Sequence, residues 1–215
     1  MMADSSRIED ALGQAAIRLA GKGFLQPSDT LSQRVPEQHA FVEVTIAEPG
    51  GVTAFRWANL QDTSFSLHHR IYLTRPDVGA IASGALPWTS ALARLGLSLP
   101  AVFDEQVRHL GVEVSRVSIR STDERPIAAL SNRANAYALD DVSLCFGMGL
   151  ERLTANVEIL EKCAESFLLA RSASPKVKRI PWLVKFIANG RLRKDQKDAA
   201  ARHLRGERAI IKAGY

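Results

Sequence analysis

The chain has 215 residues, of which 46% are hydrophobic, and a formal net charge of +5. This length supports one sizeable hydrophobic core with a short appendage. The longest apolar runs are far shorter than the roughly 20 residues of a membrane span. Asp4 and Glu9 stand where a signal peptide has positive charge and an apolar run. Composition therefore excludes a membrane span and favours a soluble, cytoplasmic protein.

The positive charge is concentrated near the C-terminus. Residues 176–215 contain twelve Lys or Arg and three acidic residues, a balance of +9, so residues 1–175 carry about −4. A basic segment can bind nucleic acid or an anionic surface, but a basic helix packed on an acidic neighbour has the same composition. Both explanations stay open, and the apolar residues of the segment favour docking on protein.

The two cysteines, Cys145 and Cys163, lie in apolar segments and lack the spacing of a disulfide or metal motif. We expect both to be buried thiols.

The first predicted element is a helix. Ser6 and Glu9 form a capping box, apolar residues then recur at helical spacing, and Gly21 ends the helix. Helices and strands alternate after it, which predicts an α/β sandwich. The further predicted elements are strands over 41–46 and 54–60 joined by a Gly-rich turn, a helix over 66–73, a strand over 78–82, helices over 88–95 and 104–110, a strand over 112–119, a helix over 125–137, a strand over 142–146 and a long helix capped by Asn156.

The composition changes after Arg171. Residues 172–175 read as a linker, and an amphipathic segment that begins at Pro181 is interrupted at Asn189-Gly190. We therefore expect a domain over 1–171 and a basic, helical C-terminal extension over 172–215.

The stretch Leu67-His-His-Arg-Ile-Tyr-Leu-Thr-Arg-Pro-Asp-Val-Gly-Ala-Ile81 resembles the core signature of the class II aldolase/adducin family. The resemblance extends to residues 99–111 and 149–170, and back to 19–24 and 31–34. It covers roughly residues 7 to 171. It implies a three-layer α/β/α fold, a homotetramer, and a site between neighbouring subunits. Family enzymes cleave or epimerise sugar phosphates with a divalent metal held by His, and others are decarboxylases.

The family's metal and catalytic positions carry other side chains in this sequence. By resemblance, the family's His-x-His pair corresponds to Ser83 and Ala85, and a third His corresponds to Trp88. A fourth His, before the last Gly motif, corresponds to Met148. The acid/base Glu corresponds to Ser64, beside Thr63, and a catalytic Tyr corresponds to Asp104. Hydroxyl, methyl and thioether groups do not hold Zn²⁺. We therefore predict no metal site and no cofactor.

The turn that would bind phosphate by resemblance reads Gln26-Pro-Ser-Asp-Thr30. Pro27 lacks an N–H donor and Asp29 repels phosphate, so a sugar-phosphate substrate is disfavoured. The expected ligand pocket comprises Ser28, Thr30, Thr63, Ser64, Ser83, Ala85, Trp88 and Met148.

Three residues are weak catalytic candidates: His68, Asp104 and His109. His68 and its neighbour His69 point about 100° apart on a helix, so they do not chelate together, and structural packing explains His68 more simply. Asp104 and His109 share one short helix. Ser83 as a nucleophile would need His68 as its base.

Three functional hypotheses follow from these observations. The favoured one is a class II aldolase-like protein that has lost metal-dependent chemistry and binds a small ligand or partner. The second is a metal-independent lyase, decarboxylase or isomerase. The third is an adducin-like interaction module that presents basic tails to an acidic partner.

Overall fold

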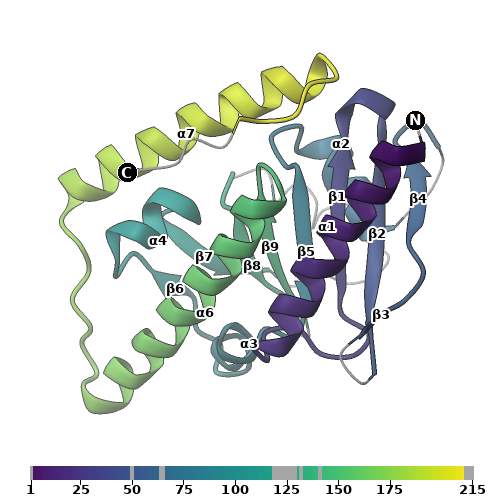
Figure 1. The fold of residues 1–215 in the computed structure, drawn as a ribbon. Coiled ribbons are helices and arrows are strands. Elements are labelled where there is room, and N and C mark those ends of the chain that lie inside the picture. Colours follow the sequence, from purple (N-terminus) through teal and green to yellow (C-terminus); the bar gives the residue numbers. More distant parts are fainter. Residues whose placement is uncertain are drawn as a thin grey trace.

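The computed structural model describes residues 2–48, 51–62, 66–117, 130, 133–139 and 142–210. In this part of the chain a nine-stranded mixed sheet lies between helices, so the predicted three-layer α/β/α fold is confirmed (Figure 1). No helix within these ranges is both long enough and apolar enough to cross a membrane.

The strand order is β3-β2-β1-β5-β9-β8-β7-β6, with β4 also paired to β2. Neighbouring strands are antiparallel, except that β7 and β8 run parallel. The strands are β1 Thr30–Val35, β2 Ala40–Ala47, β3 Gly51–Val52, β4 Arg56–Asn59, β5 Ala80–Gly84, β6 Leu99–Pro100, β7 Glu113–Arg116, β8 Ala136–Ala138 and β9 Ser143–Gly147.

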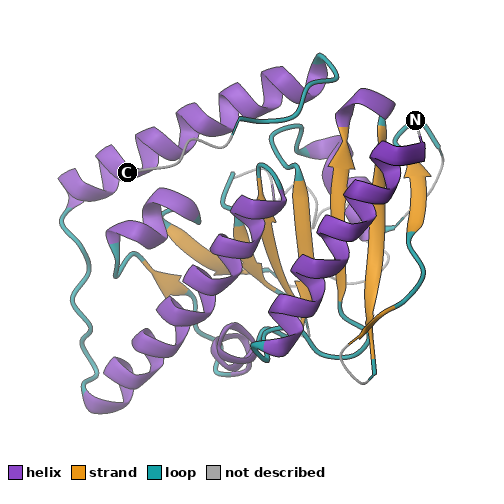
Figure 2. Cartoon of the chain, in the orientation of Figure 1, coloured by secondary structure: helices purple, strands orange, loops and turns teal. Residues whose placement is uncertain are grey.

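Helices cover both faces of the sheet (Figure 2). One face packs against α1 and α6 in the larger hydrophobic cluster, and the other packs against α2 in a second cluster around Tyr72 and Phe146. Both cysteines are buried free thiols, as predicted. The helices are α1 Met2–Gly21, the short 3-10 helix η1 Pro36–Gln38, α2 Leu67–Thr74, α3 Pro87–Arg94, α4 Asp104–His109, α6 Leu150–Ala173 and α7 Trp182–Leu204.

Two predicted helix starts are wrong. α1 begins at Met2, so Ser6 lies inside the helix and does not cap it. α6 begins at Leu150, and Asn156 is a fully buried residue of its second turn. The Asn156 side-chain amide donates to the carbonyl of Phe146 at 2.7 Å. Asn156 therefore ties α6 to β9, because a buried amide needs a hydrogen-bond partner wherever packing places it.

Two further predictions need correction, and one strand was missed. Residues 136–138, the end of the helix predicted over 125–137, form strand β8 between β7 and β9. Most of that predicted helix lies outside the described residues. Strand β1 was not predicted, although it joins β2 to β5. α7 also continues through Asn189-Gly190 without a break.

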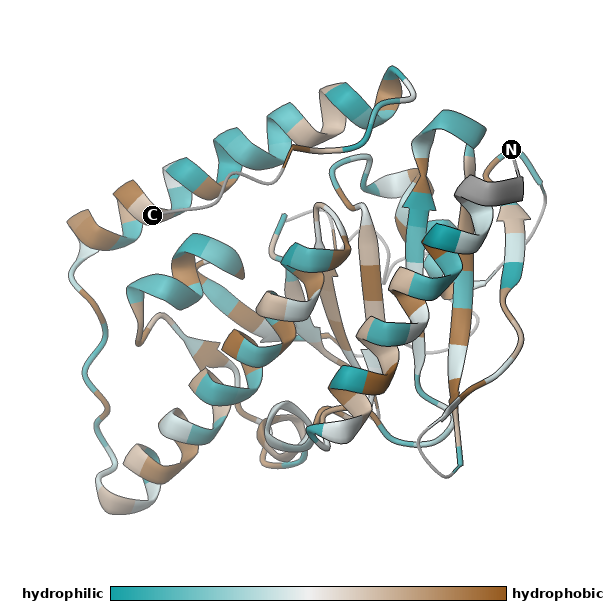
Figure 3. Cartoon of the chain, viewed as in Figure 1, coloured by the Kyte–Doolittle hydropathy of each residue, from teal (hydrophilic) through white to brown (hydrophobic). Residues whose placement is uncertain are grey.

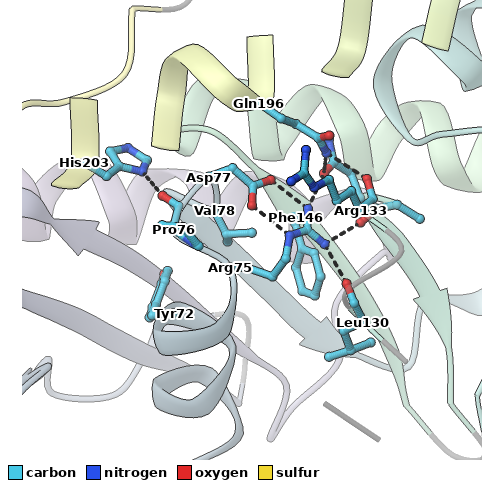
Figure 4. A network of polar contacts seen from close by, with 12 residues as sticks. Tyr72, Arg75, Pro76, Asp77, Val78, Leu130, Arg133, Phe146, Gln196 and His203 are labelled. Atoms are coloured by element: carbon cyan, nitrogen blue, oxygen red, sulfur yellow. Dashed lines mark hydrogen bonds and ion pairs between the residues drawn. The ribbon is translucent and has the colours of Figure 1, made fainter. Parts of the chain in front are cut away.

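The C-terminal helix α7 is fastened to the body through a buried polar network (Figure 4). Gln196 donates from Nε2 to the carbonyl of Arg133 at 2.8 Å and to Oδ1 of Asn135 at 3.0 Å. His203 donates from Nδ1 to the carbonyl of Pro76 at 2.7 Å. The C-terminal segment thus docks on the body of the same chain. The boundary between a domain and an extension at residue 171 stays a prediction.

Candidate functional site

A group of polar side chains faces α2 where β1, β2 and β5 lie side by side. Thr30 opens β1 and stands opposite Ser83 of β5, so the register brings these two predicted pocket residues together. Glu43 of β2 stands opposite Ser32, on the same face of the sheet as Thr30. His68 reaches this group from α2, whose first turn is capped by Ser66 through the N–H of His69.

His68 lies between a hydroxyl and a carboxylate. Its Nε2 is 3.4 Å from Oγ1 of Thr30, and its Nδ1 is 3.3 Å from Oε2 of Glu43, without the angles of a hydrogen bond. Burial lowers the pKa of His68 to about 4, although the charge of Glu43 acts in the opposite direction. The imidazole is therefore neutral at pH 7, and its lowered pKa makes it a weak base.

Glu43 was missed by sequence reasoning. Its carboxylate forms an ion pair with Arg56 of β4 as well as facing His68. The available signal was an acidic residue between the apolar Val42 and Val44 of a predicted strand, since a charge there needs a partner.

Asp29 closes the end of β5. Its Oδ2 accepts hydrogen bonds from the peptide N–H of Gln26 at 2.8 Å and of Ala85 at 3.1 Å. A Cβ atom on Gly84 would lie 2.3 Å from Cγ of Asp29. The carboxylate can therefore occupy this position only because residue 84 is a glycine. Burial raises the pKa of Asp29, and the two N–H bonds partly offset that rise. Asp29 thus occupies two peptide donors, and these donors are not available to an anion while the carboxylate holds them.

Ser28, in the same turn, has a φ of 78°, in the left-handed region. Its peptide N–H donates to the carbonyl of Ile46 at 3.0 Å, so that donor also serves the fold. The predicted pocket residues Thr63 and Ser64 lie outside the described residues.

Trp88, the second residue of α3, lies beside a carboxylate that sequence reasoning also missed. Glu161 of α6 accepts from the N–H of Trp88 at 2.8 Å and from the N–H and Oγ1 of Thr89 at 3.0 and 2.6 Å. Burial raises the pKa of Glu161, and these bonds partly offset that rise. Since Leu86, the residue before α3, has no polar side chain, Glu161 supplies the helix cap from a distant element.

The donor set at the end of β5 does not fit the divalent metal that the sequence resemblance implies. Ser83 and Ala85 offer no imidazole, thiolate or carboxylate, and Asp29 is engaged by two peptide N–H groups. Among the residues that the structure describes, no group of three His, Cys, Asp or Glu side chains is placed to hold a metal ion.

Met148 does not join the other predicted pocket residues. In the β5–β9 register, Gly84 pairs with Ser143 and Ala80 pairs with Gly147. Met148 follows Gly147, so it lies at the end of β5 opposite to Ser83. There it lines a cavity of about 340 Å³ formed with Arg152 of α6 and residues of α7. Position along the chain did not reveal this, because antiparallel pairing decides which strand ends meet.

Asp104 and His109 are also apart from the Thr30–Ser83 group, because α4 packs against α6 and α7 rather than against α2. Asp104 lines a groove between α4 and α7. His109 accepts at Nδ1 from the guanidinium of Arg152 at 2.8 Å. Burial, and then the charge of Arg152, lower the pKa of His109 to about 4.

Comparison with known proteins places the fold. No family model and no curated protein matches the sequence. YgbL from Escherichia coli, described as a putative aldolase/epimerase/decarboxylase, is similar in structure with a TM-score of 0.71 and 18% identity, over 87% of this chain and 99% of that one. An L-fuculose 1-phosphate aldolase gives a TM-score of 0.70 and 18% identity, over 87% and 97% of the two chains.

An aldolase II superfamily protein from Pseudomonas syringae has a TM-score of 0.66 and 16% identity, over 91% of this chain and 88% of that one. The protein is thus a three-layer α/β protein with a buried polar group beside its central strands. More specifically, it has the class II aldolase fold.

Proposed function

We propose that this chain is a class II aldolase-like protein that has lost metal-dependent aldol chemistry and binds a small polar ligand. The ligand would bind near Thr30 and Ser83, in a pocket shared between subunits. The observation that carries the proposal is the contact of Asp29 with Ala85 and Gly84. An internal carboxylate takes the peptide donors at the strand end where the family places metal and substrate.

The charges near this pocket favour an unphosphorylated ligand. Asp29 and Glu43 contribute carboxylates, whereas Thr30 and Ser83 contribute hydroxyls. Carboxylates repel a phosphate dianion, and hydroxyls donate to and accept from sugar-like hydroxyl groups. The nearby cation Arg56 is already paired with Glu43.

Elemental analysis of protein purified without chelator tests the loss of the metal. We expect far less than one zinc, manganese or iron ion per chain. The matched control is the double variant Ser83→His/Ala85→His, which restores two imidazoles and should raise the zinc content. About one ion per wild-type chain would contradict the proposal.

Thermal-shift measurements test the charge of the ligand. We expect inorganic phosphate to leave the melting temperature of the wild-type protein unchanged. The variant Asp29→Gly frees the N–H groups of Gln26 and Ala85, so phosphate should stabilise it. The exposed Asp10→Asn variant is the control for a general change of charge. Equal stabilisation of wild type and Asp29→Gly would refute the role of Asp29.

A second candidate is a metal-independent lyase, decarboxylase or isomerase. It is favoured by the neutral, buried His68 between Thr30 and Glu43. As a general base with so low a pKa, His68 would contribute about 10²-fold to the rate, the lower end of the usual range. Assays on hydroxy-ketones and β-keto acids should then lose that factor in His68→Gln. His69→Gln is the matched control, because His69 bonds instead to the carbonyl of Leu60 at 3.2 Å.

We also propose a homotetramer, since the family places its pocket between subunits. Light scattering should give four times the chain mass of 23.5 kDa. A monomeric mass would contradict the proposal of a pocket between subunits. It would not contradict ligand binding within one chain.

A further inference from the structure

The first two turns of α7 expose large apolar side chains away from the body. We call this surface, made of Trp182, Leu183, Phe186 and Ile187, the apolar face of α7. Trp182 and Phe186 are each 72% exposed, Leu183 is 51% and Ile187 is 49%. The start of α7 is correspondingly brown at the left of Figure 3. A helix that is apolar on its outer side as well as its inner side is ordinarily covered by a second surface.

This face is held in place rather than left on a loose end. Before it, the N–H of Ile180 donates to the carbonyl of Ala101 at 3.0 Å. After it, Ala188 is buried in a small cluster with Ala101 and Val107. The chain is thus attached to the body on both sides of the exposed residues. This attachment fixes the position of the apolar face, while its side chains remain exposed.

The surrounding sequence is strongly basic. Residues 166–194 contain eight Lys or Arg and no Asp or Glu. At the helical repeat, the exposed Lys194 and Lys197 continue the outer side of α7 beyond the apolar residues. The acidic residues Asp104 and Glu105 of α4 line the groove between α4 and α7, to which Ile187 of the apolar face also contributes. The outer side therefore carries apolar groups followed by cations.

We propose that the apolar face of α7, with its flanking cations, binds the surface of an anionic lipid membrane. Trp and Phe in a basic helix suit the membrane interface, where rings enter the acyl boundary and Lys and Arg meet lipid phosphates. A symmetric contact with the same face of a second copy would bring two basic, acid-free segments together, and like charges oppose it. Nucleic acid would use the cations and rings but gives no role to Leu183 and Ile187.

Flotation of the full chain with vesicles tests this proposal. The chain should bind vesicles of phosphatidylcholine and phosphatidylglycerol in equal parts, and not vesicles of phosphatidylcholine alone. Added salt should weaken the binding, because it screens the attraction between the cations and the lipid phosphates. Failure to bind the mixed vesicles overturns the proposal.

Variants then locate the binding surface. Trp182→Ala/Phe186→Ala should weaken vesicle binding about tenfold or more, since it removes both exposed rings. Leu204→Ala is the matched control: Leu204 is 73% exposed at the other end of α7, and its loss should leave binding unchanged. Equal binding by wild type and the double variant refutes the assignment of this face. A lower mass of the double variant in light scattering, without vesicles, would show instead that a second copy covers the face.

Discussion

The guanidinium of Arg75 donates two hydrogen bonds to the carboxylate of Asp77, at 2.8 and 2.7 Å, in the interior of the protein. Arg75 also donates to the carbonyls of Leu130 and Ala134, each at 3.0 Å (Figure 4). This pair joins the end of α2 to the sheet and to the segment that α7 covers.

Replacing Asp77 by Ala should destabilise the protein strongly. The substitution leaves the buried Arg75 cation without its carboxylate, a loss of about 3–5 kcal/mol. Urea unfolding measures it. Arg18→Ala removes an ion pair with Glu158 in which Arg18 is 59% exposed, and should cost at most about 1 kcal/mol. Similar losses in the two variants would show that the buried pair has no special role.

Gly84→Ala should destabilise the protein through a clash with Asp29. The added Cβ would lie 2.3 Å from Cγ of Asp29, and overpacking of this kind costs about 1–3 kcal/mol. Asp29→Gly in the same chain removes the clash, so the double variant should lose less stability than the two single variants together. Gly21→Ala is the control, because nothing lies within 4 Å of its added Cβ. Additivity within about 0.5 kcal/mol would mean that the two residues do not interact.

His68 should make the protein less stable in mild acid. Burial holds its folded-state pKa at about 4, below its ordinary value of 6.5, so the unfolded chain binds more protons between these values. Stability contributed by this group therefore rises as pH increases from about 4 to 6.5, by roughly 3 kcal/mol, and is level above. Chemical denaturation across this range measures the slope.

The comparison with His68→Gln isolates this contribution, because the other titrating groups remain in both proteins. The variant should show a flatter slope below pH 6.5, and the exposed His39→Asn should keep the wild-type slope. An unchanged slope in His68→Gln would show that His68 is not the group responsible.

Gln196→Ala should loosen α7. The substitution removes one hydrogen-bond donor from the carbonyl of Arg133 and one from Oδ1 of Asn135. We expect this loss to cost about 1–3 kcal/mol. The neighbouring, exposed Lys197→Ala should change stability by less than about 0.5 kcal/mol. Hydrogen exchange of the amides of α7 in the two variants measures the difference. Equal protection would indicate that packing alone holds the helix.

Local sequence patterns predicted many of the elements. The start of α2 follows from Ser66, whose hydroxyl accepts the N–H of His69, and β2 follows from its alternating apolar residues. These signals work because capping and strand alternation act over a few residues. The same locality explains the errors at Ser6 and Asn156, where suitable capping residues lie inside longer helices.

What the sequence determined by itself was the fold class, the resemblance to class II aldolases, and the absence of metal-binding side chains at Ser83 and Ala85. Only the tertiary structure decided that Asp29 covers that strand end, that Glu161 caps α3, and that Met148 lies at the opposite end of the sheet. The physical reason is range. A residue's type limits which bonds it can form, but strand register and helix packing choose its partner among residues far away in the chain.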